Sequence, residues 1–245
     1  MDNKKVYDFG YQEVTEKEKT EKVSTVFDSV ADKYDLMNDI MSFGSHRLWK
    51  RQMISWLAPS KNSILLDMAS GTGDITKLFL KYVKNEARVY AVDPNAKMLE
   101  IAKKKLAKNK NIKWFSESAE KLSFKDNYFD YYIISFGLRN TSNINHALEE
   151  AYRVLKPGGR FICLEFSKIK NYNLSKLYDF YSKSIPKIGN IIVGDSQPYQ
   201  YLVESIKNFY SQEELIDLMK KSNFYKSEYR NLSGGIVAIH SGWKI

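Results

Sequence analysis

One short segment of this chain limits what it can fold into more than any other. Residues 64–68 are apolar apart from Asp67, glycines follow at positions 71 and 73, and a helical pattern begins at Asp74. The pattern predicts a strand, a tight loop and a helix. Glycine allows a backbone to approach a ligand closely, and the amides of the first helical turn point toward the same place. The segment therefore predicts a binding site for a nucleoside.

The spacing of the glycines argues against a dinucleotide. The dinucleotide fingerprint places a further glycine three residues after Gly73, where the helix packs closely on the strand. Position 76 of this chain is Thr. The remaining pattern, Asp-x-x-x-Gly-x-Gly, fits a ligand without a pyrophosphate better than it fits NAD.

Strand and helix patterns alternate along the middle of the chain. Strands are expected at 64–68, 88–92, 112–115, 130–135 and 160–166, followed by a final pair at 224–231 and 235–240. The run at 130–135 is almost unbroken, as in a central parallel strand covered on both faces. The final pair is joined by too few residues for a crossover helix, so it must be antiparallel. These patterns predict an α/β fold with a doubly wound, Rossmann-like sheet of seven strands, mostly parallel with an antiparallel last strand.

The 245 residues are expected to form a single domain with helical additions. The expected parts are a flexible arm at 1–19, a helical substrate cap at 20–58, a cofactor-binding core at 63–166, a helical lid inserted at 167–208, and a C-terminal helix and hairpin at 209–245. The insertion carries an apolar, aromatic stripe from Leu174 to Ile185 at helical spacing. Pro186 and Gly189 are expected to break up the segment that follows.

The net charge of +9 is compatible with nucleic acid, an anionic membrane or an acidic substrate. Much of this charge falls on solvated helix faces, such as Lys103 to Lys105. The apolar runs are shorter than the ~20 residues that a transmembrane helix needs, and the N-terminus has no secretory pattern. The single cysteine, Cys163, lies in an apolar strand and suits a reducing compartment. We therefore expect a cytoplasmic protein that associates peripherally with the membrane.

Candidate ligand-binding residues follow the ends of successive strands, where ligands bind in a doubly wound sheet. Asp93 ends the second strand, 20 residues after Gly73, and its carboxylate can accept both hydroxyls of a ribose. A simple helix cap is the alternative role for Asp93. Ser118 and Ala119 follow the third strand, where a loop can frame an adenine ring. Residues 135–140 follow the fourth strand, between the cofactor and a second substrate.

These features resemble the class I S-adenosylmethionine-dependent methyltransferases. Four segments are more narrowly similar to the UbiE/MenG family of quinone C-methyltransferases: VFDSVADKYDLMND at 26–39, MSFGSHRLWK at 41–50, SFGLRN at 135–140 and RVLKPGG at 153–159. The likeness runs from about Val23 to the C-terminus. The first three segments are specific to this family, whereas the last segment and the glycine motif are common to many methyltransferases.

The resemblance implies S-adenosyl-L-methionine as the cofactor. The residues that it implies as cofactor contacts are Gly71, Thr72, Gly73, Asp93, Ser118, Ala119 and Ser135. Two positions depart from the family pattern, because Ser stands at 70, where Gly is frequent, and at 118, where Asp or Asn is frequent. The shorter side chain at 118 weakens the case for a direct hydrogen bond to the adenine amino group.

The implied reaction is methylation of a ring carbon of a prenylated naphthoquinol, from demethylmenaquinol to menaquinol in menaquinone biosynthesis. The ubiquinone precursor is left open as a further substrate. A ring carbon becomes nucleophilic when the neighbouring hydroxyl ionises, and a phenol with a pKa of about 10 is ionised in only about one molecule in a thousand near neutrality. Arg139 can lower that pKa by about 1 to 3 units but is a poor proton acceptor. His46 is the better direct base, and Tyr34 and Asn140 complete the predicted catalytic set.

Each catalytic candidate also has an ordinary structural interpretation. His46 can be a satisfied helix histidine, Tyr34 a core residue, Arg139 a brace for its loop and Asn140 a cap for the next helix. The catalytic hypothesis predicts that Arg139→Ala and His46→Ala keep cofactor binding and lose turnover.

Two other functions compete with quinol methylation. An RNA methyltransferase would suit the basic charge, but the Asn/Asp-Pro-Pro-aromatic motif of amino-group methylation is absent after the strand at 130–135. A nucleotide-binding module without turnover is the third candidate. No cluster of His, Cys and carboxylates has metal-ligand spacing, so no metal is expected, and no nucleic acid partner is expected either. We expect transient contact with the membrane surface, and the oligomeric state is left open, a homodimer included.

Overall fold

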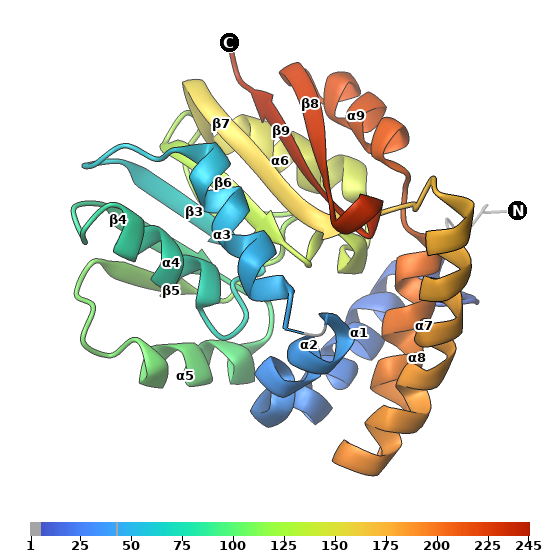
Figure 1. Cartoon of the computed structure of the whole chain (residues 1–245). Helices are drawn as coiled ribbons and strands as arrows, with labels where there is room; N and C mark the ends of the chain where they lie inside the picture. The colour runs from blue at the N-terminus through green and yellow to red at the C-terminus, as the bar shows by residue number, and fades with distance from the viewer. Residues whose placement is uncertain (1–5, 43) are drawn as a thin grey trace, which may run out of the picture.

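Seven strands form one central sheet in the computed structural model, which describes residues 6–42 and 44–245 (Figure 1). In spatial order they are β5 (Ile112–Phe115), β4 (Arg88–Val92), β3 (Ile64–Met68), β6 (Phe129–Ser135), β7 (Leu155–Phe166), β9 (Val237–Trp243) and β8 (Tyr225–Leu232). Neighbours from β5 to β7 are parallel, and β9 runs antiparallel to both β7 and β8. The predicted doubly wound, mostly parallel sheet with an antiparallel last strand is confirmed.

The order of the strands reverses beside β3. The chain passes from β3 to β4 and β5 on one side and then returns to place β6 against the other edge of β3. Met68 at the end of β3 is in register with Val92 of β4 and with Ile134 of β6. The carboxyl ends of three strands therefore meet at the place where ligands bind in such sheets.

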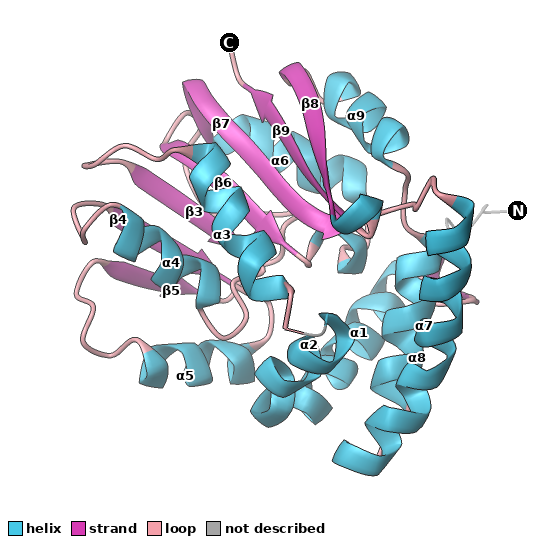
Figure 2. Ribbon diagram, in the orientation of Figure 1, coloured by secondary structure: helices cyan, strands magenta, loops and turns pink. Residues whose placement is uncertain are grey.

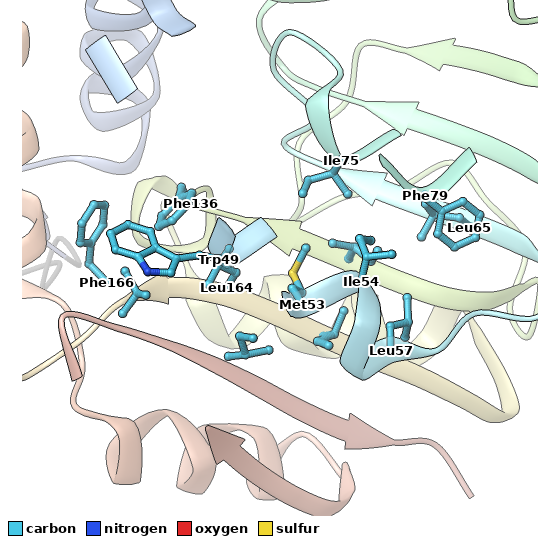
Figure 3. Close-up of a cluster of buried hydrophobic side chains, with 14 of the residues drawn as sticks. Trp49, Met53, Ile54, Leu57, Leu65, Ile75, Phe79, Phe136, Leu164 and Phe166 are labelled. Carbon is cyan, nitrogen blue, oxygen red and sulfur yellow. The ribbon is translucent and has the colours of Figure 1, made fainter. Parts of the chain in front are cut away.

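Helices cover both faces of the sheet. Successive side chains of a strand point to opposite faces, and the buried strand residues form one apolar cluster on each face. On one face α3 (His46–Leu57) and α4 (Asp74–Tyr82) pack on the sheet, and Figure 3 shows Trp49, Met53, Ile54, Leu57 and Phe79 gathered around Leu65 and Leu164. The other face is covered by α6 (Ile144–Val154) and α9 (Gln212–Lys221). Helix α5 (Ala96–Lys105) follows β4. Although α3 lies inside the predicted substrate cap at 20–58, its apolar side belongs to the core of the sheet.

The N-terminal segment is folded from residue 6 onward, whereas residues 1–5 of the predicted arm lie outside the described residues. Strands β1 (Tyr7–Phe9) and β2 (Gln12–Val14) form a hairpin, and α1 (Glu16–Val30) begins with a capping box at Thr15. A short turn leads from α1 into α2 (Tyr34–Ser42). The expectation of a flexible arm is therefore corrected for residues 6–19.

The hairpin packs on a helix of the inserted segment, α8 (Gln197–Asn208). Phe9 stacks on Tyr201 with 4.4 Å between the ring centroids, and the Tyr11 amide donates to the Glu204 carboxylate over 3.2 Å. The side chain of Asn208 donates to the Gly10 carbonyl. These partners lie almost 200 residues away along the chain, so a polar N-terminal sequence gives no sign of them.

The predicted insertion consists of α7 (Tyr172–Val193) and α8 (Gln197–Asn208), which lie side by side (Figure 2). Helix α7 continues through Pro186 and Gly189, so the expected interruption is wrong. A Cβ on Gly189 would lie 2.2 Å from the Tyr199 ring, which shows that this glycine permits close contact with α8. Within the described ranges, no helix combines the length and the apolar character needed to cross a bilayer.

Candidate active site

A cavity of about 270 Å³ lies at the carboxyl ends of β3 to β6 and is covered by α1. Six of the sequence-predicted residues line it: Gly71, Asp93, Ser118, Ala119, Tyr34 and Asn140. Side chains of α1, including Val23 and Phe27, form its outer wall. The structure thus brings together residues that follow β4 and β5, on one side of β3, and residues that follow β6, on its other side.

Three of the predicted cofactor contacts lie outside this lining. The Thr72 hydroxyl donates to Asp35 Oδ1 over 3.0 Å, and Gly73 precedes α4 with a φ of 83°. A Cβ on Gly73 would approach the Leu106 side chain to 2.8 Å, so this glycine serves close packing. The Ser135 hydroxyl is buried and has no hydrogen-bond partner in the described part of the chain. Cofactor contact by Thr72, Gly73 and Ser135 stays a prediction.

Asp93 is oriented by two backbone amides. Its Oδ2 accepts from the Gly71 amide and its Oδ1 from the Asn95 amide, each over 2.8 Å. Burial raises the pKa of Asp93 to about 6, although both hydrogen bonds act in the opposite direction. Asn95 itself caps α5 by accepting from the Met98 amide, so Asp93 is not the helix cap. Each carboxylate oxygen keeps a lone pair that can accept a ribose hydroxyl.

The loops around the cavity approach each other closely. A Cβ on Gly137 would lie 2.4 Å from the Ala69 Cβ, so the loop after β6 presses on the loop after β3. Gly71 has a φ of 53°, and the Tyr34 ring lies 3.7 Å from the position of a Cβ on this glycine. A glycine cradle with a carboxylate 2.8 Å from its amide fits the adenosine part of S-adenosylmethionine.

Asp67, the first residue of the glycine motif, has a structural role. Its Oδ2 accepts a 2.6 Å hydrogen bond from the Thr76 hydroxyl, and the residue is 1% exposed. Burial raises the pKa of Asp67 to about 7. Thr76 occupies the position where a dinucleotide motif would have its further glycine. The threonine therefore ties the start of α4 to β3 through the buried acid.

Arg139 lies in a short turn after β6 and is fixed by a buried ion pair. Its Nη1 donates to Glu165 Oε1 over 2.8 Å and to the Phe136 carbonyl over 2.7 Å. Glu165, near the end of β7, is 0% exposed and also accepts from the Phe166 amide over 2.9 Å. Burial raises the pKa of Glu165, and the Arg139 charge opposes that rise. The Arg139 Nε is buried without a partner among the described residues.

Phe136 connects Arg139 to the cavity. Its φ of 56° lies in the left-handed region, which is unusual for an aromatic residue. Its carbonyl accepts from both Arg139 and Asn140, at 2.7 and 3.4 Å, and its ring lines the cavity beside Trp49 and Phe166 (Figure 3). Arg139 therefore does brace its loop, and a catalytic role for it stays a prediction.

Three tyrosines lie around Arg139. The Tyr201 hydroxyl donates to Asn140 Oδ1 over 3.0 Å. Burial raises the pKa of Tyr201 to about 12 and also raises the pKa of Tyr34 and of Tyr178, while the Arg139 charge lowers all three. The hydroxyls are therefore neutral near pH 7. A narrow crevice between α1, α2 and α8 reaches Tyr34, Tyr201 and Arg139.

The helix-cap alternative for Asn140 is not supported, because α6 is capped by a different residue. The Asn143 side chain accepts from the amides of Asn145 and His146. The Asn140 amide group is instead shared between the Phe136 carbonyl and the Tyr201 hydroxyl.

His46 lies apart from these residues. It begins α3, where its Nε2 is 2.8 Å from Asp39 Oδ1. Its ring is buried, and burial lowers the pKa of His46. It is not among the residues that line the cavity or the crevice. The structure therefore brings Arg139, Asn140 and Tyr34 together but leaves His46 outside, in the position of an ordinary helix histidine.

A second cavity of about 270 Å³ reaches Arg139 from the side of the N-terminal hairpin. Its lining is polar and includes Asp8, Lys19 and Tyr201. Lys19 is 7% exposed, and burial lowers its pKa against the opposing charges of Asp8 and Glu120. The buried Arg139 therefore borders a second cavity whose lining is mostly polar.

Sequence reasoning missed Glu165, Tyr178 and Tyr201. Glu165 had a usable signal, because it is the only charged residue in the apolar strand segment 161–166. Tyr201 had none, because its hydrogen bond to Asn140 spans 61 residues of chain.

Comparison with known proteins extends these observations. Residues 15–244 match the ubiE/COQ5 methyltransferase family. The chain is 52% identical over 244 residues to the ubiquinone/menaquinone biosynthesis C-methyltransferase UbiE of Rickettsia bellii, covering 97% of this chain and 98% of that protein. It is 50% identical over 246 residues to the protein of the same name from Hydrogenovibrio crunogenus, covering 99% and 97%.

Solved structures agree on the fold. A SAM-dependent methyltransferase from Thermotoga maritima superposes with a TM-score of 0.62 and 23% identity, covering 91% of this chain and 100% of that one. Another from Aquifex aeolicus gives a TM-score of 0.61 and 18% identity, covering 85% and 98%. At these identities the likeness shows a shared methyltransferase fold.

Proposed function

Because the chain belongs to the ubiE/COQ5 methyltransferase family and is an S-adenosylmethionine-dependent methyltransferase, we propose that it methylates a ring carbon of demethylmenaquinol to give menaquinol. The corresponding ubiquinone precursor is a second acceptor to assay, since the names of the relatives include both quinones. One observation carries the proposal. A buried arginine surrounded by tyrosines adjoins the nucleoside cavity through Phe136 and Asn140.

The residues of the cavity hold the cofactor for this reaction. When bound, S-adenosylmethionine supplies an electrophilic methyl group. Asp93 orients the ribose with its two carboxylate oxygens, and the amide of Gly71 keeps that carboxylate in place. Phe136 and Gly137 form the wall between the nucleoside and the acceptor ring. These residues would hold the two reactants next to each other in a site that α1 covers.

Ionisation of the quinol is the task of the residues around Arg139. The ionisation deficit near neutral pH is about 3 pKa units, or roughly 4 kcal/mol. A buried cation offsets about 1 to 3 units, and Glu165 limits this effect by balancing part of the charge. The neutral tyrosines cannot act as bases near pH 7 because burial raises the pKa of each. Alignment of the reacting atoms supplies the remaining acceleration.

One proton must leave the site for each methyl group that replaces a ring hydrogen. His46 lines neither the cavity nor the crevice, and Arg139 stays protonated. The polar second cavity reaches Arg139 and contains Asp8 and Lys19. We assign proton release to water in that cavity, in place of the direct base that the sequence analysis predicted.

The acceptor also determines where the protein works. A prenylated naphthoquinol partitions into the bilayer, so the enzyme has to meet it at the membrane surface from the cytoplasm. The net charge of +9 favours contact with anionic lipid.

The test uses purified protein, S-adenosylmethionine labelled in its methyl group and reduced demethylmenaquinone in detergent. The expected product carries label on a ring carbon. Oxidised demethylmenaquinone is the matched control and should take up no label, because it has no hydroxyl to ionise. Label on oxygen, or label in added RNA with none in the quinone, would contradict the proposal.

A further inference from the structure

The outer face of α7 exposes an unusual set of large apolar side chains. Tyr172, Leu177, Phe180 and Ile191 are 68%, 65%, 75% and 84% exposed. With about 3.6 residues per turn, these four positions fall within an arc of about 140° around the helix. Ile185, on the opposite side, is 0% exposed. In Figure 1 the helix lies at the margin of the molecule, with α8 beside it.

Basic side chains share this arc. Lys176, Lys183 and Lys187 are exposed and fall between the apolar positions. The Lys176 ammonium lies 4.4 Å from the centroid of the Tyr172 ring. None of the three lysines forms an ion pair with a residue that the structure describes. We call the four apolar residues and the three lysines the α7 outer face.

We propose that the α7 outer face docks on a bilayer that carries anionic headgroups. The apolar side chains would enter the interface between headgroups and acyl chains while the lysines bind the lipid phosphates. The proposal rests on the proposed function, because a lipid-borne acceptor gives the enzyme a reason to bind the membrane. It goes further by naming the surface that binds.

The charge of the α7 outer face favours a bilayer over a second copy of the chain as its binding partner. A twofold interface pairs one surface patch with itself. Each copy would bring three lysines and, at the edge of the arc, one exposed acid, Asp179, so two net positive patches would meet. Like charges held in an interface oppose association. Anionic headgroups instead neutralise them, and each lysine near such a surface strengthens binding by about fivefold.

The inner face of α7 connects the docking surface to the acceptor site. Tyr178 is close enough to Arg139 for the arginine charge to lower the tyrosine's pKa. The Tyr181 hydroxyl donates to the Ile40 carbonyl of α2, and Gly189 packs on Tyr199 of α8. The outer side of α7 therefore carries the proposed membrane surface, and its inner side carries one of the tyrosines around Arg139.

The first experiment measures binding to vesicles by flotation. Wild-type protein should bind phosphatidylcholine vesicles that contain phosphatidylglycerol at least about tenfold more tightly than vesicles of phosphatidylcholine alone. The double variant Leu177→Glu, Phe180→Glu should lose about tenfold or more of this affinity. Tyr82→Glu is the matched control, because Tyr82 is 50% exposed on α4 and should be neutral. Equal binding by the double variant and wild type would overturn the proposal.

The second experiment keeps this proposal separate from the proposed function. The double variant should methylate a demethylmenaquinol with a truncated, water-soluble side chain at the wild-type rate and should lose activity on long-chain substrate embedded in anionic vesicles. Failure of wild-type protein on the soluble substrate would count against the function, not against the docking surface. Light scattering tests whether a second copy of the chain binds this face instead. A wild-type dimer that becomes monomeric in the double variant would show that the face is an interface between copies and would overturn the proposal.

Discussion

The two sides of the site are built in different ways. The proposed cofactor half consists of Gly71, Asp93, Ser118 and Ala119, which line one cavity and follow the ends of three neighbouring strands within 50 residues of chain. Its central contact is a carboxylate held by backbone amides. Backbone geometry after a parallel strand is set locally, and few other segments take part.

The proposed acceptor half is assembled from segments that are distant in the sequence. Its members are Tyr34, Arg139, Glu165, Tyr178 and Tyr201, which come from α2, the turn after β6, β7, α7 and α8. Its defining contacts join one side chain to another, such as Arg139 to Glu165 and Tyr201 to Asn140. Such contacts exist only when the separate segments are packed together. The comparison therefore teaches that cofactor binding and methyl transfer should be separable by substitution.

The largest expected effect is on the cofactor half. Asp93→Asn should weaken S-adenosylmethionine binding by about 100-fold, because hydrogen bonds to a charged acceptor contribute about 1.5–3 kcal/mol. Isothermal titration measures the dissociation constant. Ser118→Ala is the matched control in the same cavity and should change it by less than about threefold. An unchanged dissociation constant for Asp93→Asn would remove this residue from the cofactor half.

The next effect is on the acceptor half. Glu165→Gln should lower kcat by about 30-fold while the dissociation constant of the cofactor stays within about twofold, because Arg139 loses the carboxylate that holds it in position, a loss that outweighs the stronger field of an unpaired cation. The same loss should reduce the free energy of unfolding by about 3–5 kcal/mol. Glu165→Asp, which keeps the charge, should recover part of kcat. A loss of cofactor affinity in Glu165→Gln as large as its loss of kcat would show that the two halves of the site are not separable.

The pH dependence of cofactor binding offers a third comparison. Burial raises the pKa of Asp93 to about 6, and the ionised carboxylate is the form that accepts ribose hydroxyls. Affinity should therefore rise with pH through about 6, level off above it, and fall about tenfold for each pH unit below it. Titrations between pH 5 and 8 measure this slope, and Asp93→Asn should flatten it. If the affinity of Asp93→Asn still changed with pH in the same way, a group other than Asp93 would be responsible for the pH dependence.

The smallest effect is expected at His46. Because its ring lies outside the cavity, His46→Ala should leave turnover within about twofold of wild type. Loss of the Asp39 contact should lower the free energy of unfolding by about 1–3 kcal/mol, measured by urea denaturation. A large loss of turnover in a variant with normal stability and cofactor affinity would restore His46 as the base.

Much of the fold and the cofactor half could be predicted because the signals are local. The apolar run at 130–135 indicated a central parallel strand, and β6 occupies that position. Turn chemistry alone singled out Gly71 and Asp93, and the structure brings both into the lining of one cavity. Each of these signals depends on a few consecutive residues and on the end of a strand.

The remainder depended on packing that the sequence does not display. The hairpin at 7–14 is held by α8. Helix α7 runs through Pro186, and its Gly189 fits closely against Tyr199 of α8. His46 resembled a base in a family-specific segment, yet its helix packs on the sheet and turns its ring toward Asp39. Side-chain partners across such distances become visible only in three dimensions.

Substitutions in one half of the site should impair cofactor binding, and substitutions in the other half should impair methyl transfer. The most direct test measures the rate of methyl transfer to reduced demethylmenaquinone as a function of S-adenosylmethionine concentration. Asp93→Asn should approach the wild-type rate once the cofactor is saturating, and Glu165→Gln should stay about 30-fold slower at every concentration. A maximal rate for Asp93→Asn as low as that of Glu165→Gln would contradict the division of the site into a cofactor half and an acceptor half.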